Sequence, residues 1–293
     1  MTTFNRSIVA LDLSSTDEQV LSFCNFLFQS LETKTTYFLH IIPNFVYPDN
    51  IELEFQKMFA PEIPLDEKVR ERISESISEF CPRAEQLETH VEVIEGKPYQ
   101  KLLHWTEVKS ADLLVVGNKK DSDGSGITPR KIAKNAKSSI CYIGTKSNPN
   151  VKRILVGVDY SDFSKRAILT AVQMKKQNPE IEIVALNLMD LPSTAIKINK
   201  NHAEFVRRME KIAHEKMLVF LARLGVHKSV STVYEMNEYF DVAKHLRHYA
   251  KKNEIDMIVI GAQGHSYFDN FLYGSVAEKL VHREKELPVL VVR

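Results

Sequence analysis

The stretch "IDMIVIG", residues 255–261, occurs twice in the chain in slightly different forms. The earlier form, "ADLLVVG" at residues 111–117, has the same apolar run between an aspartate and a glycine. A second pair precedes these in the same order: "RSIVALDLSS" (6–15) and "KRILVGVDYSDFS" (152–164) both run from an apolar stretch into an aspartate and a serine turn. Two elements recurring in one order at nearly equal spacing predict a duplicated domain.

Each half alternates short apolar runs with helical patterns. The runs of the second half are rich in branched residues and lack strict alternation, which is typical of parallel strands buried on both faces. We expect strands at 154–158, 181–188, 231–234, 257–260 and 289–292. Between the second and third runs, a helical stripe is expected to end at Gly225 and to comprise Phe205, Met209, Ile212, Lys216, Phe220 and Leu224.

The strand and helix order predicts an α/β fold. Right-handed crossovers between parallel strands place helices on both faces of a sheet. We therefore expect two tandem doubly wound domains, 1–148 and 149–293, each with a roughly five-stranded parallel sheet flanked by helices.

The composition favours a soluble globular protein, with 44% hydrophobic and 26% charged residues in 293. Since 39 Lys and Arg nearly cancel 38 Asp and Glu, no overall field draws the protein to nucleic acid or to a membrane surface. The absence of an apolar leader or of a long apolar run predicts a cytoplasmic protein. Cys24, Cys81 and Cys141 lack metal-ligand spacing, so we expect buried, reduced thiols.

Glycines gather where the last "IVIG" run gives way to a helix. Gly261 and Gly264 follow the carboxyl end of a strand, where ligands bind in doubly wound sheets. Gly274 and Ser275 precede an apolar helix, whose first N–H groups attract anions. The pattern predicts a phosphate site without the Walker motif. Alternatively, the glycines only end a strand and form a turn, and Ser275 only caps a helix.

A carboxylate belongs to the same region. Asp159 ends the first strand of the second half, which neighbours the fourth strand at the point where strand order reverses. There it could accept hydrogen bonds from a ribose or from an adenine amino group. The alternative is an ordinary aspartate in a surface turn.

The spacing Gly261-x2-Gly264-x9-Gly274-Ser275, followed by the "PVLVV" strand at 288–292, resembles the ATP-binding signature of universal stress proteins. The resemblance covers nearly the whole chain as two tandem domains. It implies a cytoplasmic, stress-associated protein whose second domain binds ATP or a related adenine nucleotide. Asp159 could in addition hold Mg²⁺ through the phosphates.

The resemblance also implies roles for particular residues. In the family, phosphates lie against the loop glycines, the Gly-Ser helix start and the backbone of the next residue, while the first-strand aspartate faces the nucleoside and the end of the second strand contacts adenine. Carried over, the cofactor-binding residues are Val158, Asp159, Leu188, Gly261, Gly264, Gly274, Ser275 and Val276.

The first half departs from this pattern. It keeps Gly117, but Lys120 replaces the second glycine, so we expect a degenerate copy that does not bind nucleotide. Where the family commonly has a histidine before the adenine contact, the second half has Asn187, while the first half keeps His40. We interpret His40 as structural.

No catalytic constellation or metal site is evident in the sequence. His245 and His248 are three residues apart on a predicted helix, and we expect a solvated face there rather than a zinc site. His265 is the only titratable residue of the glycine loop placed to touch a phosphate. The leading hypothesis is a regulatory nucleotide-binding protein with at most weak ATPase activity or self-phosphorylation. An interaction scaffold that binds no nucleotide and an ATP hydrolase are the alternatives.

Single-domain relatives commonly dimerise through their last strands. We therefore expect residues 140–143 and 289–292 to pair within this chain as an intramolecular pseudo-dimer. An unidentified protein partner and a higher assembly stay open.

Overall fold

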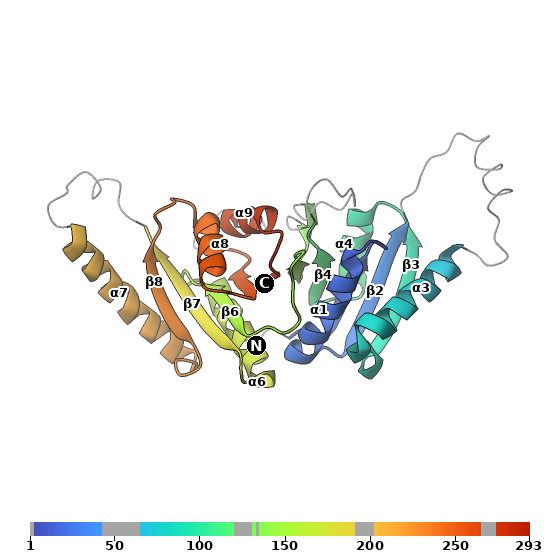
Figure 1. Ribbon diagram of the computed structural model, residues 1–293, viewed down its shortest axis with the longest axis horizontal. Helices are drawn as coiled ribbons and strands as arrows, with labels where there is room; N and C mark the ends of the chain where they lie inside the picture. The colour runs from blue at the N-terminus through green and yellow to red at the C-terminus, as the bar shows by residue number, and fades with distance from the viewer. Residues whose placement is uncertain (1–2, 43–64, 120–130, 133–134, 191–201, 265–273) are drawn as a thin grey trace.

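The computed structural model describes residues 3–42, 65–119, 131–132, 135–190, 202–264 and 274–293, in which strands and helices alternate (Figure 1). The strands are β1 (Arg6–Leu11), β2 (Thr35–Ile42), β3 (Glu88–Glu95), β4 (Leu113–Gly117), β5 (Ser139–Ile143), β6 (Arg153–Gly157), β7 (Glu182–Met189), β8 (Ser231–Met236), β9 (Met257–Gly261) and β10 (Val289–Val292). The helices are α1 (Thr16–Leu31), α3 (Leu65–Phe80), α4 (Pro98–Val108), α6 (Asp162–Gln177), α7 (His202–Arg223), α8 (Val242–Lys252) and α9 (Ser275–Arg283), with a short 3-10 helix, η1 (Pro82–Gln86). The strand bounds of the second half differ from the expected ones by at most two residues.

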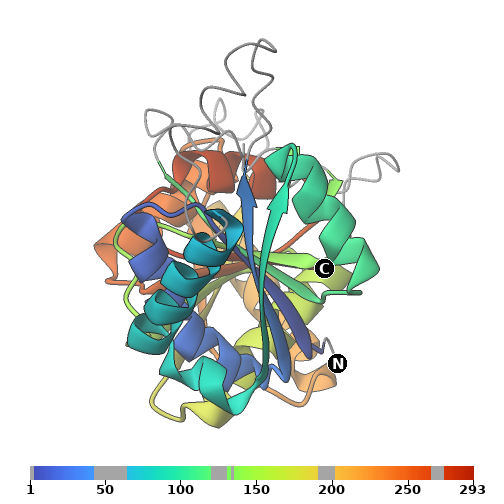
Figure 2. The same ribbon diagram turned by 90° about the vertical axis from the view of Figure 1, so that its right-hand side faces the viewer.

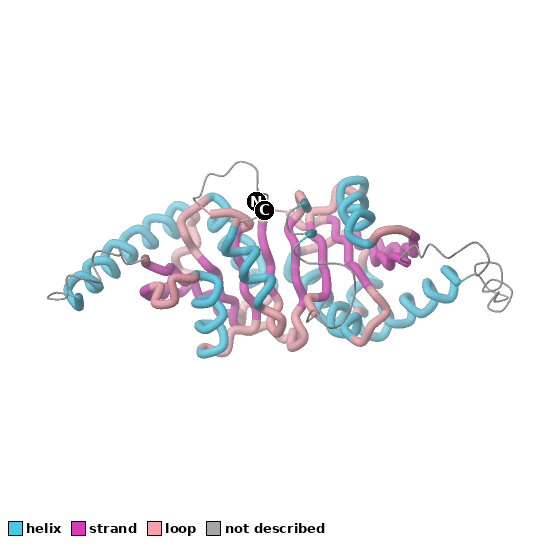
Figure 3. Tube along the Cα trace, turned by 90° about the horizontal axis from the view of Figure 1, so that it is seen from above, coloured by secondary structure: helices cyan, strands magenta, loops and turns pink. Residues whose placement is uncertain are grey.

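The strands form one ten-stranded sheet in the order β3-β2-β1-β4-β5-β10-β9-β6-β7-β8. Within each half all neighbouring strands are parallel, and the first strand lies between the second and the fourth. Figure 3 shows the strands running through the middle of the molecule with helices on both sides. Seen end-on in Figure 2, the first half has α1 and α3 on one side of its strands and α4 on the other. The expected pair of doubly wound α/β domains is confirmed.

The aspartate that the two halves share before the fourth strand is structural. The Oδ2 atom of Asp256 accepts hydrogen bonds from the backbone N–H groups of Lys152 and Arg153, each at 2.8 Å. Asp112 does the same for the N–H of Arg6 at 3.0 Å. In both halves this carboxylate ties the start of the first strand to the start of the fourth, which explains why the repeat preserves it.

Helix α7 buries only part of the expected stripe, in which Phe220 and Leu224 pack against the core. Ile212 and Lys216 are exposed, and Ala213, Met217 and Leu221 face the core instead. The physical reason is that a rotation of one residue takes the lysine out of the core while keeping a continuous apolar row at steps of four. Although α7 has 22 residues, no helix within the described ranges is long and apolar enough to cross a membrane.

The three cysteines are buried free thiols, as the sequence predicts. Burial raises the pKa of the Cys81 thiol to about 12 and raises that of Cys141 further. Thiolates are the reactive form of cysteine, so these three side chains act as small apolar groups of the core.

The two halves pair through their last strands, as expected. Strand β10 runs antiparallel to β5, with Val289 opposite Tyr142, Leu290 opposite Cys141 and Val291 opposite Ile140. These six side chains are fully buried, so the seam between the halves is continuous with the core of each half.

Two residues of the first half fit closely against the second. A Cβ atom on Gly144 would lie 2.5 Å from the backbone C and O of Glu286, so only glycine allows the chains to approach this closely. Asn118 is buried, and its Nδ2 atom donates to the carbonyls of Val281 at 3.0 Å and Glu284 at 2.7 Å. The side chain of Asn118 thus satisfies carbonyl groups at the C-terminal end of α9.

Candidate functional site

A cavity of about 270 Å³ opens at the carboxyl ends of β6 and β9 in the second half. These strands are neighbours at the point where strand order reverses, and the start of α9 closes one side. The lining comprises Gly157, Val158, Asp159, Ser164, Leu186, Leu188, Asp190, Val242, Leu246, Ile260, Gly261, Ala262, Gln263, Gly264, Gly274, Ser275, Val276 and Ala277. All eight residues that the sequence suggested as cofactor-binding therefore lie around one hollow.

Asp159 is held in a defined orientation by the turn that follows it. Its Oδ1 atom accepts hydrogen bonds from the Ser161 N–H at 3.0 Å and from the Ser164 hydroxyl. Its own N–H donates to the Ser164 oxygen at 3.1 Å. The serines thus orient the carboxylate of Asp159, which is exposed, and the bond from the Ser161 N–H is also the one that an aspartate makes in an ordinary turn.

The two loop glycines are required for different reasons. A Cβ atom on Gly264 would lie 2.5 Å from Oδ2 of Asp159, so the missing side chain makes room for that carboxylate in the cavity. A Cβ atom on Gly261 would lie 2.6 Å from Cβ and 2.7 Å from the backbone C of Phe163 in α6. Gly261 therefore lines the cavity, but the close packing of α6 on β9 already explains why a glycine stands at this position.

The start of α9 faces the cavity without a side-chain cap. Gly274 occupies the N-cap position, and its N–H donates to the carbonyl of Ala262 at 2.7 Å, which fixes the turn. By contrast, Ser161 caps α6 and Asp241 caps α8 through their side-chain oxygens. The first N–H groups of α9 are therefore placed to receive an anion from the cavity.

The opposite end of the cavity suits an apolar ring. Leu188, Val242 and Leu246 line it, the last two from the first turns of α8. Asp190 stands beside them, with its Oδ1 atom accepting a hydrogen bond from Asn237 Nδ2 at 2.8 Å. Sequence reasoning missed Asp190, although its place just after the second strand follows the same carboxyl-edge rule that selected Asp159.

The charge of the lining is negative. Asp159 and Asp190 are its carboxylates, and the described lining contains no lysine or arginine. No cluster of three metal-ligating side chains occurs among the described residues. A phosphate-bearing ligand would therefore rely on backbone N–H groups and on a cation that it brings with it.

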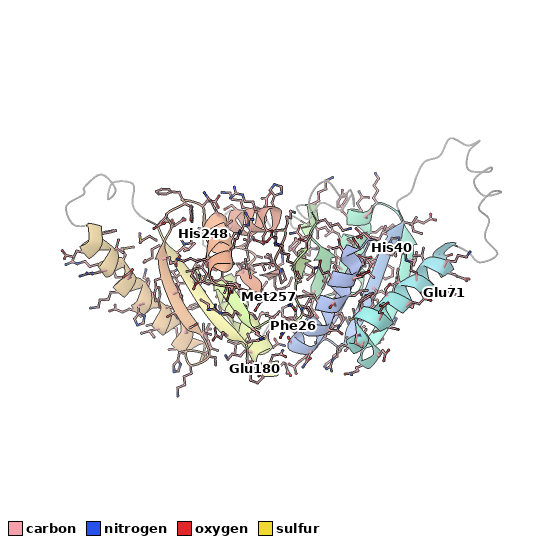
Figure 4. All side chains as sticks on the ribbon, viewed as in Figure 1. Phe26, His40, Glu71, Glu180, His248 and Met257 are labelled. Atoms are coloured by element: carbon pink, nitrogen blue, oxygen red, sulfur yellow. The ribbon has the colours of Figure 1, made fainter. Side chains whose placement is uncertain are left out.

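His40 and Asn187 make the same hydrogen bond in the two halves. The Nδ1 atom of His40, labelled in Figure 4, lies 3.0 Å from the carbonyl oxygen of Leu11. Asn187 Nδ2 donates to the equivalent carbonyl, that of Val158, at 2.8 Å. The asparagine thus replaces the family histidine without loss of this bond, and both residues are structural.

The corresponding place in the first half is filled by a side chain of the protein itself. The Nζ atom of Lys119 lies 2.7 Å from Oδ2 of Asp12, the counterpart of Asp159, and also donates to the Ser14 hydroxyl. Burial alone would raise the pKa of Asp12, but the hydrogen bonds from Lys119 and Ser14 lower it below the ordinary value. Lys120, on which the sequence argument rested, lies outside the described residues, as does His265.

Asp17 makes the first half sensitive to pH. Burial, and next the charge of Asp12, raise the pKa of Asp17 to about 6. Its folded pKa exceeds the unfolded value of about 3.9, so the stability that Asp17 contributes is complete below about pH 4 and is lost as pH rises to about 6. We expect the unfolding free energy of Asp17→Asn, which does not ionise, to fall by about 1–2 kcal/mol less than that of the wild type between pH 4 and pH 7.5. The comparison is made between pH values because asparagine cannot accept all the hydrogen bonds that the carboxylate receives from the N–H groups of Asp12 and Leu13.

Urea unfolding at pH 4 and at pH 7.5 measures this difference. Asp66→Asn on the exposed first turn of α3 is the control. An equal change in unfolding free energy at both pH values would contradict the expectation for Asp17.

His245 corrects the expected solvated histidine face. It is buried, with Nε2 at 2.6 Å from Glu235 Oε2 on β8, whereas His248 is exposed. The sequence showed the spacing of the two histidines, but it did not show that the preceding strand, β8, supplies a carboxylate to one of them.

Comparison with known proteins agrees with this architecture. The sequence profile of the universal stress protein family matches residues 3–140 and 150–293. Universal stress protein MJ0531 of Methanocaldococcus jannaschii is 27% identical over 142 residues, which are 48% of this chain and 82% of that protein. The crystal structure of a universal stress protein from Archaeoglobus fulgidus gives a TM-score of 0.65 at 17% identity, covering 100% of this chain and 97% of that one.

A universal stress protein crystallised in complex with cAMP is 17% identical, covering 47% of this chain and 94% of that one, with a TM-score of 0.33.

The chain consists of two doubly wound domains in tandem, and one of them has a glycine-lined cavity at the switch point of its sheet. This combination defines the class of protein. Because the family profile covers both halves, the chain belongs to the universal stress protein family.

Proposed function

We propose that the second half, residues 149–293, binds ATP or a related adenine nucleotide with little or no turnover. The first half, 1–148, is in this proposal a non-binding copy, and the whole is a cytoplasmic regulatory protein of the stress family. The observation that carries the proposal is the convergence of Asp159, Gly264 and the uncapped start of α9 on one cavity.

The proposed orientation follows from the two ends of the cavity. Adenine would lie on the apolar side, against Leu188, Val242 and Leu246. The phosphates would lie at Gly274, Ser275 and Val276, where backbone N–H groups and the helix dipole favour negative charge. Asp159 would accept hydrogen bonds from the nucleoside between these ends.

Mg²⁺ fits this arrangement as a partner of the nucleotide. Two carboxylates and no basic side chain among the described lining residues oppose a bare triphosphate, and a bound cation offsets that repulsion. We therefore propose binding of the Mg²⁺ complex, with Asp159 as the residue that would approach the metal through the phosphates.

The scaffold and the hydrolase are weaker candidates. A scaffold without a ligand gives no reason for Gly264 to make room for an oriented carboxylate. A hydrolase needs a group that activates water, and the two carboxylates of the described lining, Asp159 and Asp190, already accept hydrogen bonds from Ser164 and Asn237.

Calorimetric titration of the full chain with ATP and Mg²⁺ tests the proposal, beside Asp159→Asn and its counterpart Asp12→Asn in the first half. We expect one-to-one binding that Asp159→Asn weakens at least tenfold and that Asp12→Asn leaves unchanged. Absence of binding at millimolar ATP would favour the scaffold. Phosphate release on the timescale of seconds would favour the hydrolase.

A further inference from the structure

A second cavity, of about 510 Å³, lies between the two halves and shares no lining residue with the glycine-lined cavity. The first half contributes the segment before β1 and the junction of α1 with β2, and the second half contributes α6 and the turn after α7. Its volume falls in the range of about 300–1,000 Å³ that holds small molecules, and such sites are frequent at domain interfaces.

The walls of this cavity combine polar side chains with an apolar part that both halves supply. Phe4 and Leu31 face it from the first half, and Val172 and Val226 face it from the second; all four side chains are more than nine-tenths buried in the core. These side chains belong to the core, so the apolar part of the cavity lies at the edge of the packed interface between the halves.

The internal repeat shows what fills the equivalent place in the other half. Thr16 and Phe163 occupy equivalent positions, because they pack beneath Gly117 and Gly261 respectively. Seven residues further along the two helices stand Phe23 in α1 and Thr170 in α6.

Ten residues after Thr16 and Phe163, α1 has Phe26 and α6 has Gln173. Figure 4 labels Phe26 where α1 meets α6. The buried rings of Phe23 and Phe26 have centroids 5.5 Å apart. The second half therefore lacks two phenyl groups that its sister copy possesses.

The helix η1 adds a second difference between the surroundings of α1 and α6. In the first half, Asn25 of α1 accepts a hydrogen bond from the Arg83 N–H at 3.1 Å and donates to the Phe80 carbonyl at 2.8 Å, which holds η1 against α1. The residue equivalent to Asn25 is Val172, which lies in the cavity wall. The second half thus loses both the rings and the polar anchor, and the hollow remains.

A polar group in the wall has no partner. Thr170 is 1% exposed, and its hydroxyl makes no hydrogen bond within the described ranges. A buried hydroxyl without a partner is destabilising. Gln173 beside it donates to the Leu31 carbonyl at 3.3 Å, so this amide nitrogen does not serve Thr170.

The charges at the rim favour an anion. Lys34 and Lys176 line the cavity from the two halves, and Glu32 is its carboxylate. All three are exposed, and the two ammonium groups outnumber the carboxylate. An acid group at the rim would therefore be attracted, while its apolar body points inward.

We propose that this interdomain cavity binds a small aromatic carboxylate. The ring takes the place that Phe23 and Phe26 fill in the first half, and the carboxylate lies between Lys34 and Lys176. The site is independent of the proposed nucleotide cavity, so the failure of either proposal leaves the other standing.

Calorimetric titration of the full chain with 3-phenylpropionate tests the proposal, beside the neutral 3-phenylpropanamide. We expect one-to-one binding of the acid, at least tenfold tighter than that of the amide. Lys34→Ala and Lys176→Ala should each weaken binding of the acid several-fold and leave binding of the amide unchanged. Absence of saturable binding at millimolar acid, or equal affinity for acid and amide, would overturn the proposal.

Thr170→Phe provides the matched variant, because it copies Phe23 into the second half. It should abolish binding, since the larger side chain takes up space proposed for the ligand. Thr170→Leu is the smaller replacement if the phenylalanine variant does not fold, and it should weaken binding at least tenfold. Unchanged affinity in the folded variant would place the ligand elsewhere and overturn the assignment.

Discussion

Replacing Gly264 with lysine should abolish ATP binding, raising the dissociation constant at least a hundredfold. The new Cβ atom would lie 2.5 Å from Oδ2 of Asp159, so the carboxylate must leave its position. The ammonium group can then pair with the displaced carboxylate, as Lys119 pairs with Asp12 at 2.7 Å in the first half. A hundredfold change corresponds to about 2.7 kcal/mol, which is reasonable for the loss of a charged hydrogen-bond acceptor together with part of the cavity.

Calorimetric titration with ATP and Mg²⁺ measures this change directly. Val219→Lys is the matched control, because Val219 is 52% exposed on α7 and lies outside the cavity lining, so it adds the same charge without entering the site. A wild-type dissociation constant in Gly264→Lys would show that the nucleotide does not contact this corner of the cavity.

Replacing Val291 with glutamate should separate the two halves or unfold the seam between them. Val291 is fully buried and lies opposite Ile140 in the only antiparallel pair of the described sheet. A charge placed there has no partner, and burial of an unpaired carboxylate costs several kcal/mol. We expect a loss of at least about 4 kcal/mol in unfolding free energy.

Small-angle scattering measures the separation of the two halves, and thermal unfolding measures the loss of stability. The variant should show a larger radius of gyration or a melting temperature far below that of the wild type. Val291→Ile adds one methylene without charge and should cost less than about 1.5 kcal/mol. Unchanged scattering and stability in Val291→Glu would mean that β5 and β10 do not hold the halves together.

The sheet was predictable because its strands are buried on both faces. Strands such as β9 and β10 consist almost entirely of buried residues, so their apolar runs stand out from the surrounding sequence. The helix α7 was harder, because its outer face also carries large apolar residues. Ile212 and Leu218 are each 47% exposed, and they blur the boundary between the two faces.

The site was predictable where backbone geometry demands a particular residue. Gly264 and Asp159 follow strand ends at a recognisable spacing, and the structure places both in the lining of one cavity. Leu246 depends on how α8 packs beside the strand ends, which no local pattern encodes. The contact of Lys119 with Asp12 joins residues 107 positions apart, so only the folded chain brings them together.

The hydrogen bonds from Asn118 to the end of α9 make the second half of the duplicated chain depend on the first. Its amide satisfies two carbonyls of the second copy and accepts a hydrogen bond from Lys285 Nζ at 2.8 Å. A second copy cut free of the first would expose the carbonyls of Val281 and Glu284 together with the bare edge of β10. The first copy therefore acts as a built-in chaperone of the second, because it covers these groups from the moment both halves have folded.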